Sequence, residues 1–238
     1  MAMHIDLNAD LGEMGAESPD DALLALVSSC NIACGGHAGD DGSMRQVVRM
    51  AVKHGVAMGA HPSLPDRIGF GRRDIALDAT TLRASLHAQV GDLIAICASE
   101  GATLTHVKPH GALYHQMARD DAIAQMIATV ILELDSRLAL IGPTWGDWAK
   151  VAKDHGLRTR IEGFADRRYR DDGTLVSRSE PDALLHGGAA IEQGVRLARG
   201  GPPRIDTLCV HGDGSDAVAL TQELRAVLIA NGIEIRRC

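Results

Sequence analysis

Strand-like and helix-like segments alternate along the whole chain, and this alternation limits the possible folds more than any other feature. Apolar segments typical of strands are expected at residues 4–10, 30–35, 57–61, 104–109, 138–142, 160–165 and 207–212. Helices are expected between and after them, at residues 19–28, 42–54, 80–100, 120–134, 146–155, 182–199 and 215–230. Repeated β-then-α units predict a parallel sheet with its helices outside.

The chain of 238 residues shows no composition break or linker, so we expect a single domain over residues 1–238. An α/β fold of the TIM-like (β/α) barrel type, seven-stranded and irregular, is the first interpretation. A doubly wound open sheet is the alternative, because hydrophobic periodicity does not separate the two. The sequence lacks a glycine-rich dinucleotide fingerprint, which weakens the alternative.

The first expected strand carries polar residues along one entire face. Side chains alternate along a strand, so this face consists of His4, Asp6, Asn8 and Asp10. On a surface strand such a face would be solvated, whereas inside a barrel it is costly to bury and needs a purpose. In a barrel we expect the first three to form a buried polar network and Asp10 to lie at the catalytic mouth.

Composition and charge exclude several classes of function. The net charge is −7, which argues against nucleic acid as a partner. No apolar run approaches the roughly 18 residues of a membrane span, and the N-terminus lacks the pattern of a signal peptide. The five cysteines form no CxxC pair, which fits free thiols in a reducing compartment. We expect a cytoplasmic protein that binds neither nucleic acid nor membrane.

Ionisable side chains occur at the expected carboxyl ends of six of the seven strands. In a parallel barrel these ends surround the active site. One histidine at a strand end is more often structural, but four together favour a functional cluster. The residues at these ends include Asp10, Glu13, His37, His61, Lys108, His110, Asp166, His211 and Asp213.

Three of these residues could bind a metal ion. Asp10, His37 and His61 offer a carboxylate–His–His set with open positions for water. The tight spacing of an HExxH motif is absent. The prediction of a bound metal ion, Mg or Zn, therefore depends on the strand-end placement of these residues alone.

Acid–base and electrostatic roles can be assigned in the same way. Asp10 or Asp166 could act as general base for a water, and Lys108 with His110 could stabilise an oxyanion or donate a proton. The sequence contains neither a GxSxG serine motif nor a GxxxxGK[ST] phosphate loop. The residues favour hydrolysis or ring opening at a carbonyl by activated water.

Two long loops follow strand ends, at residues 62–76 and 166–181. Loops of this length in a compact domain usually form a lid or a binding surface. Both carry arginines, which suit carboxylate or phosphate groups. The candidates for such binding are Arg72, Arg73 and Arg168.

Several long blocks of the sequence resemble the LamB/YcsF lactam-utilisation family, and together they span nearly the whole chain. The blocks are Asp6–Glu13 (DLNADLGE), Asn31–Asp40 (NIACGGHAGD), Gly59–Ser63 (GAHPS), Phe70–Arg73 (FGRR), Val107–Tyr114 (VKPHGALY), Glu162–Tyr169 (EGFADRRY) and Val210–Asp213 (VHGD).

The resemblance implies an ATP-dependent 5-oxoprolinase that opens the lactam of 5-oxo-L-proline to L-glutamate. It also implies two partner subunits, B and C, and a barrel like those of glycoside hydrolases and polysaccharide deacetylases. The missing phosphate loop does not exclude ATP, which can bind through other loops or through a partner subunit.

The resemblance assigns no roles to single residues, so the roles are hypotheses based on strand-end position. Lys108 and His110 polarise the lactam oxygen, and Asp10 activates water, with or without a metal on His37 and His61. Substrate or phosphate binding is assigned to Asn8, Glu13, Arg72, Arg73, Arg168 and Asp213. The remaining catalytic candidates, Asp166 and His211, orient these groups.

Two other functions stay open. One is a stand-alone, metal-dependent deacetylase or amidohydrolase acting on a small amide or sugar. The other is a subunit that holds the lactam for its partners without catalysis. A homo-oligomer also stays open, because the sequence does not determine the oligomeric state.

Overall fold

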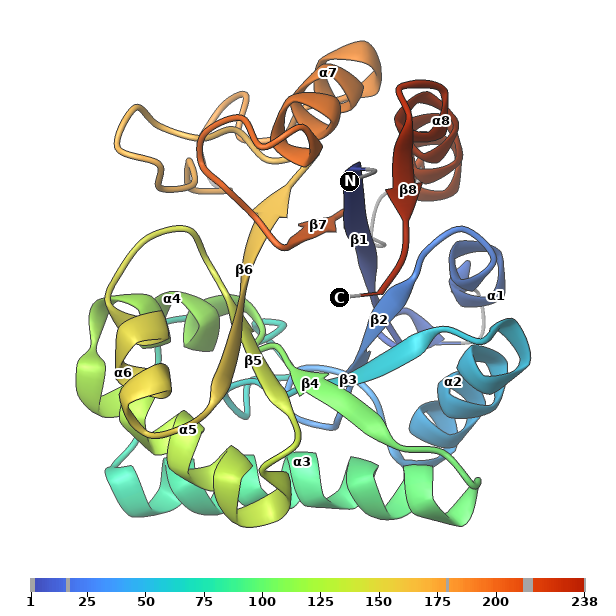
Figure 1. Cartoon of the computed structure of the whole chain (residues 1–238). Coiled ribbons are helices and arrows are strands. Elements are labelled where there is room, and N and C mark those ends of the chain that lie inside the picture. Colours follow the sequence, from blue (N-terminus) through green and yellow to red (C-terminus); the bar gives the residue numbers. More distant parts are fainter. Residues whose placement is uncertain (1–2, 16–17, 179, 212–215, 238) are drawn as a thin grey trace.

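The structure is a computed structural model that describes residues 3–15, 18–178, 180–211 and 216–237. Its strands are all parallel and form a ring around a common axis (Figure 1). The strands of this ring are β1 (Met3–Leu11), β2 (Ser29–Ala33), β3 (Ala57–His61), β4 (Leu104–Val107), β5 (Ala139–Gly142), β6 (Arg158–Phe164) and β7 (Thr207–Cys209).

Strand β1 closes the ring, because it pairs with β2 on one side and with β7 on the other. Asn8 lies opposite Ser29 in one ladder, and Asp6 lies opposite Thr207 in the other. The prediction of a seven-stranded TIM-like barrel is confirmed, and the doubly wound open sheet is wrong. The short strand β8 (Ile233–Ile235) was not predicted; it pairs with the first residues of β1, outside the ring.

The helices lie around the outside of the ring (Figure 1). They are α1 (Asp20–Leu24), α2 (Asp41–His54), α3 (Ala79–Ser99), α4 (Gly111–Arg119), α5 (Asp121–Asp135), α6 (Trp148–Asp154), α7 (Gly187–Ala198) and α8 (Ala217–Ala230). Apolar side chains between sheet and helices form the main core, which includes Leu7, Leu11, Ile32, Leu93 and Trp148. Glycines with positive φ follow α3, α6 and α8, as helix termination predicts: Gly101, Gly156 and Gly232.

Two helices have clearly different boundaries from the prediction, and one helix was not predicted. Helix α1 ends at Leu24 instead of residue 28, because the backbone of Ser28 already bonds to β1. Helix α4 was missed because it follows β4 after three residues and leads directly into α5. Helix α7 begins at Gly187 rather than residue 182, because Leu184 pairs with Arg167 and thereby ties this segment to the loop after β6.

The polar face of β1 points into the barrel. Asp6 is fully buried and accepts hydrogen bonds from Ser28, Ser29 and Thr207 at 2.6–2.7 Å. Each donor is a hydroxyl, so the carboxyl group is solvated by the protein itself. His4 is a correction: it is exposed beside Arg236 and lies outside the buried network.

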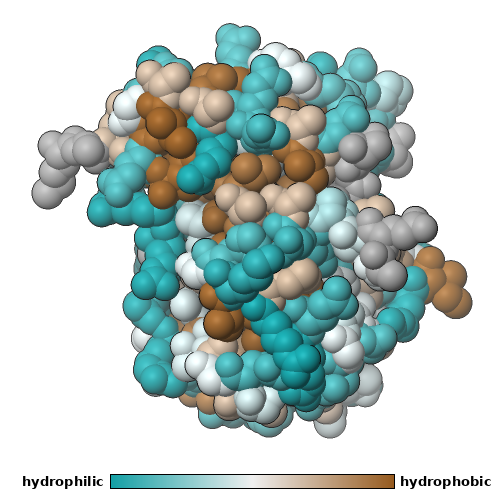
Figure 2. Space-filling view, turned by 90° about the vertical axis from the view of Figure 1, so that its right-hand side faces the viewer, coloured by the Kyte–Doolittle hydropathy of each residue, from teal (hydrophilic) through white to brown (hydrophobic). Residues whose placement is uncertain are grey.

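The outer surface is mostly polar. Figure 2 shows the side that lies on the right in Figure 1, where hydrophilic residues predominate and hydrophobic ones gather mainly in the upper half. None of the helices in the described part of the chain is long and apolar enough to cross a membrane.

Gly59 on β3 lies where the packing inside the barrel is tight, so its substitution tests that packing. A Cβ atom at Gly59 would lie 2.1 Å from the ring of His106, which is fully buried. We expect Gly59→Ala to lower the free energy of unfolding by about 1–3 kcal/mol, as overpacking does. Urea unfolding measures this change.

The matched control is Gly188→Ala in α7, where an added Cβ meets no atom within 4 Å. Alanine favours a helix over glycine, so this variant should keep or slightly raise the stability. Equal stability of the two variants would contradict the described packing.

Candidate active site at the strand ends

A cavity of about 370 Å³ opens at the carboxyl ends of the strands. Of the predicted site residues, those that line it are Asp10, Glu13, His61, Arg72, Lys108, His110 and His211. His37 lies beside them, stacked on the ring of His110 with 3.6 Å between the centroids. Residues from widely separated segments therefore meet at one site.

The ammonium group of Lys108 is buried at the base of this site. Its Nζ lies 2.8 Å from Asp10 Oδ1 and 2.9 Å from Glu162 Oε1, and it donates to Cys209 Sγ at 3.3 Å. Burial opposes the charge, but Asp10, Cys209 and Glu162 raise the pKa of Lys108 well above its usual value. Lys108 is therefore a fixed positive charge that connects β1, β6 and β7 to the end of β4.

Asp10 is held as an anion. Burial would raise its pKa, but His61 and Lys108 hold that pKa well below its usual range. Asn31 donates to Asp10 Oδ1 at 2.8 Å, and the amide oxygen of Asn31 accepts from His106 Nε2, also at 2.8 Å. Burial lowers the pKa of His106 to about 3, so this second support is a neutral ring.

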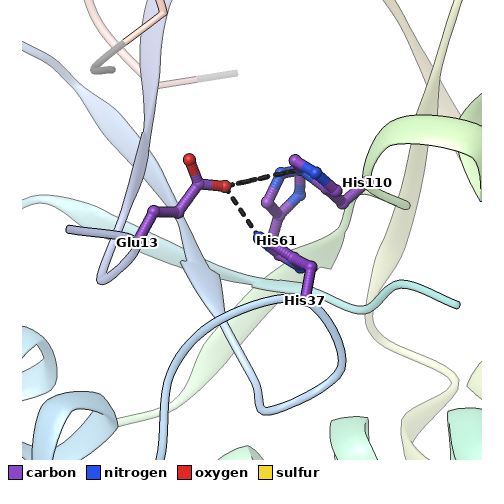
Figure 3. Close-up of side chains that lie close together, drawn as sticks. All are labelled: Glu13, His37, His61 and His110. Carbon is purple, nitrogen blue, oxygen red and sulfur yellow. Dashed lines mark hydrogen bonds and ion pairs between the residues drawn. The ribbon is translucent and has the colours of Figure 1, made fainter. Parts of the chain in front are cut away.

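A carboxyl group and three imidazoles form a cluster (Figure 3). Asp10 lies beside this cluster, in contact with His61. Glu13 follows β1, His37 follows β2, His61 ends β3, and His110 precedes α4. Glu13 Oε1 lies 2.8 Å from His37 Nε2, 3.4 Å from His110 Nδ1 and 3.7 Å from His61 Nε2. One potential ligand atom from each residue lies within 4.8 Å of the others.

Backbone carbonyls fix the orientation of two of these rings. His61 Nδ1 lies 2.7 Å from the carbonyl of Lys108, and His110 Nε2 lies 2.9 Å from the carbonyl of Phe70. A carbonyl only accepts hydrogen bonds, so both of these nitrogens carry hydrogen. The opposite nitrogens, 3.0 Å apart, then present facing lone pairs when the rings are neutral. Such an arrangement requires a shared proton or a common cation.

The donor set fits a divalent cation. Metal-bound histidines usually donate their second N–H to a carbonyl, as His61 and His110 do here. Glu13 adds a carboxyl oxygen to the three imidazole nitrogens, and zinc accepts such a mixed set of nitrogen and oxygen ligands. Imidazole ligands suit zinc better than magnesium, which prefers oxygen.

The carboxyl group that lies among the histidines differs from the one that the sequence predicts. Asp10 Oδ2 lies 3.3 Å from His61 Nε2, but its other oxygen is engaged by Lys108 and Asn31. Glu13 is the carboxyl group that lies among the imidazoles. The metal site on His37 and His61 stays a prediction, with Glu13 and His110 as additional ligands.

Asp166 and His211 form a separate pair at the cavity. His211 Nδ1 lies 2.9 Å from Asp166 Oδ2, and the backbone N–H of His211 donates to the same oxygen at 3.1 Å. Burial would raise the pKa of Asp166, but His211 lowers it below its usual value. The carboxylate therefore keeps hydrogen on Nδ1, while Nε2 has no hydrogen-bond partner among the described residues and could take part in proton transfer.

Other predicted binding residues lie away from the cavity. Asn8 is fully buried below the site and donates to Thr207 at 2.7 Å. Arg73 is paired with Asp66 inside its own loop, with 2.9 Å between Nε and Oδ2. Arg168 is exposed and does not line the cavity. Asp213 lies outside the described residues.

Sequence reasoning missed several residues of the site. Glu162 was seen at a strand end but given no role, although its position on β6 faces the barrel interior. Tyr114 donates to Glu162 at 2.9 Å, and His115 lines the cavity; both lie on the unpredicted helix α4. Cys209 contacts Lys108, and Arg167, not Arg168, faces the cavity. The alternation of side chains along β6 could have identified Glu162, but it could not have identified Arg167, which lies in a loop.

Fold and site define a (β/α)-barrel protein with a buried lysine–carboxylate group and a Glu/His cluster at its mouth. The chain belongs to the LamB/YcsF family, whose profile matches residues 5–238. A relative from Methylococcus capsulatus, the A subunit of 5-oxoprolinase, is 48% identical over 249 residues, covering 99% of this chain and 96% of the relative. The resemblance inferred from the motifs is confirmed.

Solved structures agree with this assignment. The lactam utilization protein from Thermus thermophilus is 38% identical, with a TM-score of 0.90 over 98% of this chain and 99% of that one. A family 4 carbohydrate esterase from Streptomyces lividans is 13% identical, with a TM-score of 0.53 over 98% of this chain and 91% of that one. The second likeness concerns the fold alone.

Removal of the central ammonium group should be costly. Lys108→Met leaves Asp10 and Glu162 buried without their cation, so we expect a loss of about 3–5 kcal/mol in the free energy of unfolding. Thermal or urea unfolding gives the value. Lys108→Met with Asp10→Asn should recover part of the loss, because it removes one uncompensated charge.

The control is Lys150→Met, which breaks an exposed pair with Asp154 at 2.8 Å. Exposed pairs contribute little, so a change under about 0.5 kcal/mol is expected. If Lys108→Met were no more destabilising than this control, the central role of Lys108 would be refuted.

Proposed function

We propose that this chain acts as the A subunit of a 5-oxoprolinase, opening the lactam of 5-oxo-L-proline to L-glutamate while ATP becomes ADP and phosphate. The observation that carries the proposal is the 48% identity to such a protein over 99% of the chain. The cavity supports it, because its charged and hydrogen-bonding groups suit attack on a small amide.

The proposed reaction couples two hydrolyses. A five-membered lactam is a stable amide, so transfer of a phosphoryl group to its oxygen would make the ring carbon easier to attack. Water then adds to that carbon, and the carbon–nitrogen bond breaks as the nitrogen takes up a proton, which leaves an acyl phosphate. A second water hydrolyses this acyl phosphate to the carboxylate of glutamate and free phosphate. In total, one water enters glutamate and one enters phosphate. We assign ATP binding to the assembly with partner subunits B and C, and to no residue of this chain.

Lys108 is proposed to stabilise the negative charge that develops on the lactam oxygen. Lys108 is one of the residues that line the cavity, and Asp10 and Glu162 hold its ammonium group in place before any ligand arrives. Preorganised charge of this kind needs no rearrangement during the reaction. His110 also lines the cavity and would help to position the oxygen.

Asp10 is proposed to orient the attacking water, and His211 to accept its proton. The low pKa of Asp10 makes this carboxylate a good hydrogen-bond acceptor but a weak base. His211 lines the same cavity, and Asp166 fixes its ring with Nε2 available. The same imidazolium could then protonate the departing ring nitrogen.

Glu13, His37, His61 and His110 are the residues that would hold a divalent metal. When bound, the metal would polarise a carbonyl and lower the pKa of a coordinated water. The ring orientations are compatible with the site, because a divalent cation could take the place of the proton shared between the facing nitrogens of His61 and His110.

We expect the complete assembly to operate in the cytoplasm on a free small molecule. No membrane or nucleic acid contact is part of the proposal. The likeness to a protein named as the A subunit of 5-oxoprolinase supports the existence of partner subunits. That these partners are subunits B and C is part of the proposal. A homo-oligomer is compatible with the proposal but not required by it.

The activity test uses this chain together with its partner subunits, 5-oxo-L-proline and ATP. We expect His211→Gln to lower kcat at least about 100-fold, because general acid–base groups contribute roughly 10²–10⁴-fold. His155→Gln, at the exposed end of α6, should retain full activity. Glutamate release and ADP formation are measured for each variant.

The same assay separates the alternatives. Lactam opening by the chain alone without ATP would support a stand-alone amidohydrolase instead. Normal kcat in folded His211→Gln, Asp10→Asn and Lys108→Gln variants, with only lactam affinity lost, would indicate a binding subunit without catalytic residues.

The metal assignment is tested by binding. Equilibrium dialysis against zinc should give about one ion per chain, and a chelator should lower the Tm by removing it. Glu13→Gln combined with His37→Ala should abolish this uptake. His54→Ala, which changes a surface histidine paired with Asp21, should bind as the wild type does. Absence of zinc uptake by the wild type would contradict the assignment.

A further inference from the structure

The cavity has a second charged region that the proposed mechanism leaves unused. Its lining includes four arginines from the two long loops: Arg72, Arg167, Arg170 and Arg178. One of them, Arg170, is paired with Glu180 at 2.5 Å. These cations approach the cavity from the loops after β3 and β6, whereas Lys108 and the Glu/His cluster belong to the strand ends.

Arg167 differs from ordinary surface arginines in its burial. Only 5% of the residue is exposed, and its terminal NH2 group donates to the carbonyl of Val176 at 2.7 Å. Its Nε–H is buried and has no partner among the described residues. An unpaired donor on a buried guanidinium is costly and requires an explanation.

The position of Arg167 is fixed by its surroundings. Its backbone pairs with Leu184, and its carbonyl accepts a hydrogen bond from Gln193 of α7 at 2.7 Å. Burial and the nearby charge of Arg178 lower the pKa of Arg167 to about 10, and Asp166 opposes this shift only in part. The unpaired donor is therefore part of a prebuilt group, rather than a mobile surface side chain.

We propose that Arg167 is the anchor of an oxyanion subsite, and that its ligand is the carboxylate of the lactam substrate. This inference rests on the proposed function and identifies the part of the substrate that Arg167 recognises. A guanidinium binds a carboxylate with two parallel hydrogen bonds. The lactam carbonyl would then face Lys108, with the ring between the two cations in the cavity of about 370 Å³.

A phosphate group has the same chemistry, so the test includes both sources of the anion. The full-length chain is titrated in a calorimeter with 5-oxo-L-proline, with 2-pyrrolidinone, which lacks the carboxylate, and with inorganic phosphate. We expect the wild type to bind 5-oxo-L-proline at least ~10-fold more tightly than 2-pyrrolidinone, the range of a charge-assisted hydrogen bond.

Arg167→Met should remove this difference in affinity, because it weakens the binding of 5-oxo-L-proline and leaves the binding of 2-pyrrolidinone unchanged. Arg167→Lys, which keeps the charge but loses the planar fork, should retain part of it. The matched control is Arg168→Met, because Arg168 is the exposed neighbour that does not line the cavity. Circular dichroism confirms that each variant is folded.

The outcomes separate this inference from the proposed function. If both lactams bind and Arg167→Met leaves their affinities unchanged, the subsite is refuted and the proposed function stands. If neither lactam binds but phosphate binds through Arg167, the oxyanion subsite stands with phosphate as its ligand, and the proposed substrate loses support. If none of the three probes binds, the subsite is refuted.

Discussion

The ion group of Lys108, Asp10 and Glu162 is the interaction on which the mouth of the barrel depends. Taking three charged groups out of water costs several kcal/mol each, and only close pairing offsets this cost. The pairing exists because β1, β4 and β6 are held at fixed separations by the closed ring. An open sheet would not bring the ends of these strands around one ammonium group. The closure of the sheet and the chemistry of the site are therefore one property of the fold.

The polar interior separates structural residues from functional ones by depth. Near the base, Asp6 is saturated by hydroxyl groups, and Asn8 is bonded to Thr207 and Glu162. Nothing in this layer has spare capacity for a ligand. At the mouth, by contrast, His37 Nδ1 and Arg167 Nε are buried without a hydrogen-bond partner among the described residues. Unsatisfied hydrogen-bonding capacity therefore concentrates where the cavity opens, and that location supports a ligand site rather than a packing defect.

Much of this fold could be predicted from the sequence, because strand and helix periods are local signals. The ring strands and the strand-end residues Asp10, Lys108 and His61 follow from alternation alone. Strand β8 and helix α4 escaped because one has only three residues and the other follows its strand without a clear start signal. The prediction of Arg168 instead of Arg167 has a different cause. Side chains in a loop do not alternate regularly, so the sequence does not show which of two consecutive residues faces the cavity.

The choice among carboxylates shows the same limit at the site itself. Asp10 and Glu13 are three positions apart, and no spacing rule decides which one joins the histidines. The turn through Gly12, with φ of 76°, carries Glu13 over the ends of β2 and β3, while Asp10 stays on the strand beside Lys108. The backbone turn therefore assigns the two carboxylates different partners. Asp10 therefore joins Glu162 at the lysine, and Glu13 joins the imidazole cluster.

The cavity has positive charge in two separate places, at Lys108 and at Arg167, and this arrangement would favour one orientation of a bound ligand. A ligand with an amide oxygen at one end and a carboxylate at the other would satisfy both Lys108 and Arg167 in a single orientation. A lactam without the carboxylate would bury the guanidinium of Arg167 with its donor still unpaired. Sites built to bond a polar group reject analogues that lack it more strongly than apolar pockets reject a missing methylene, because of this unpaired donor. We therefore propose that specificity arises from the loop after β6 and reactivity from the strand ends. Sequence changes in that loop could alter the accepted lactam while the barrel and its lysine–carboxylate group stay the same.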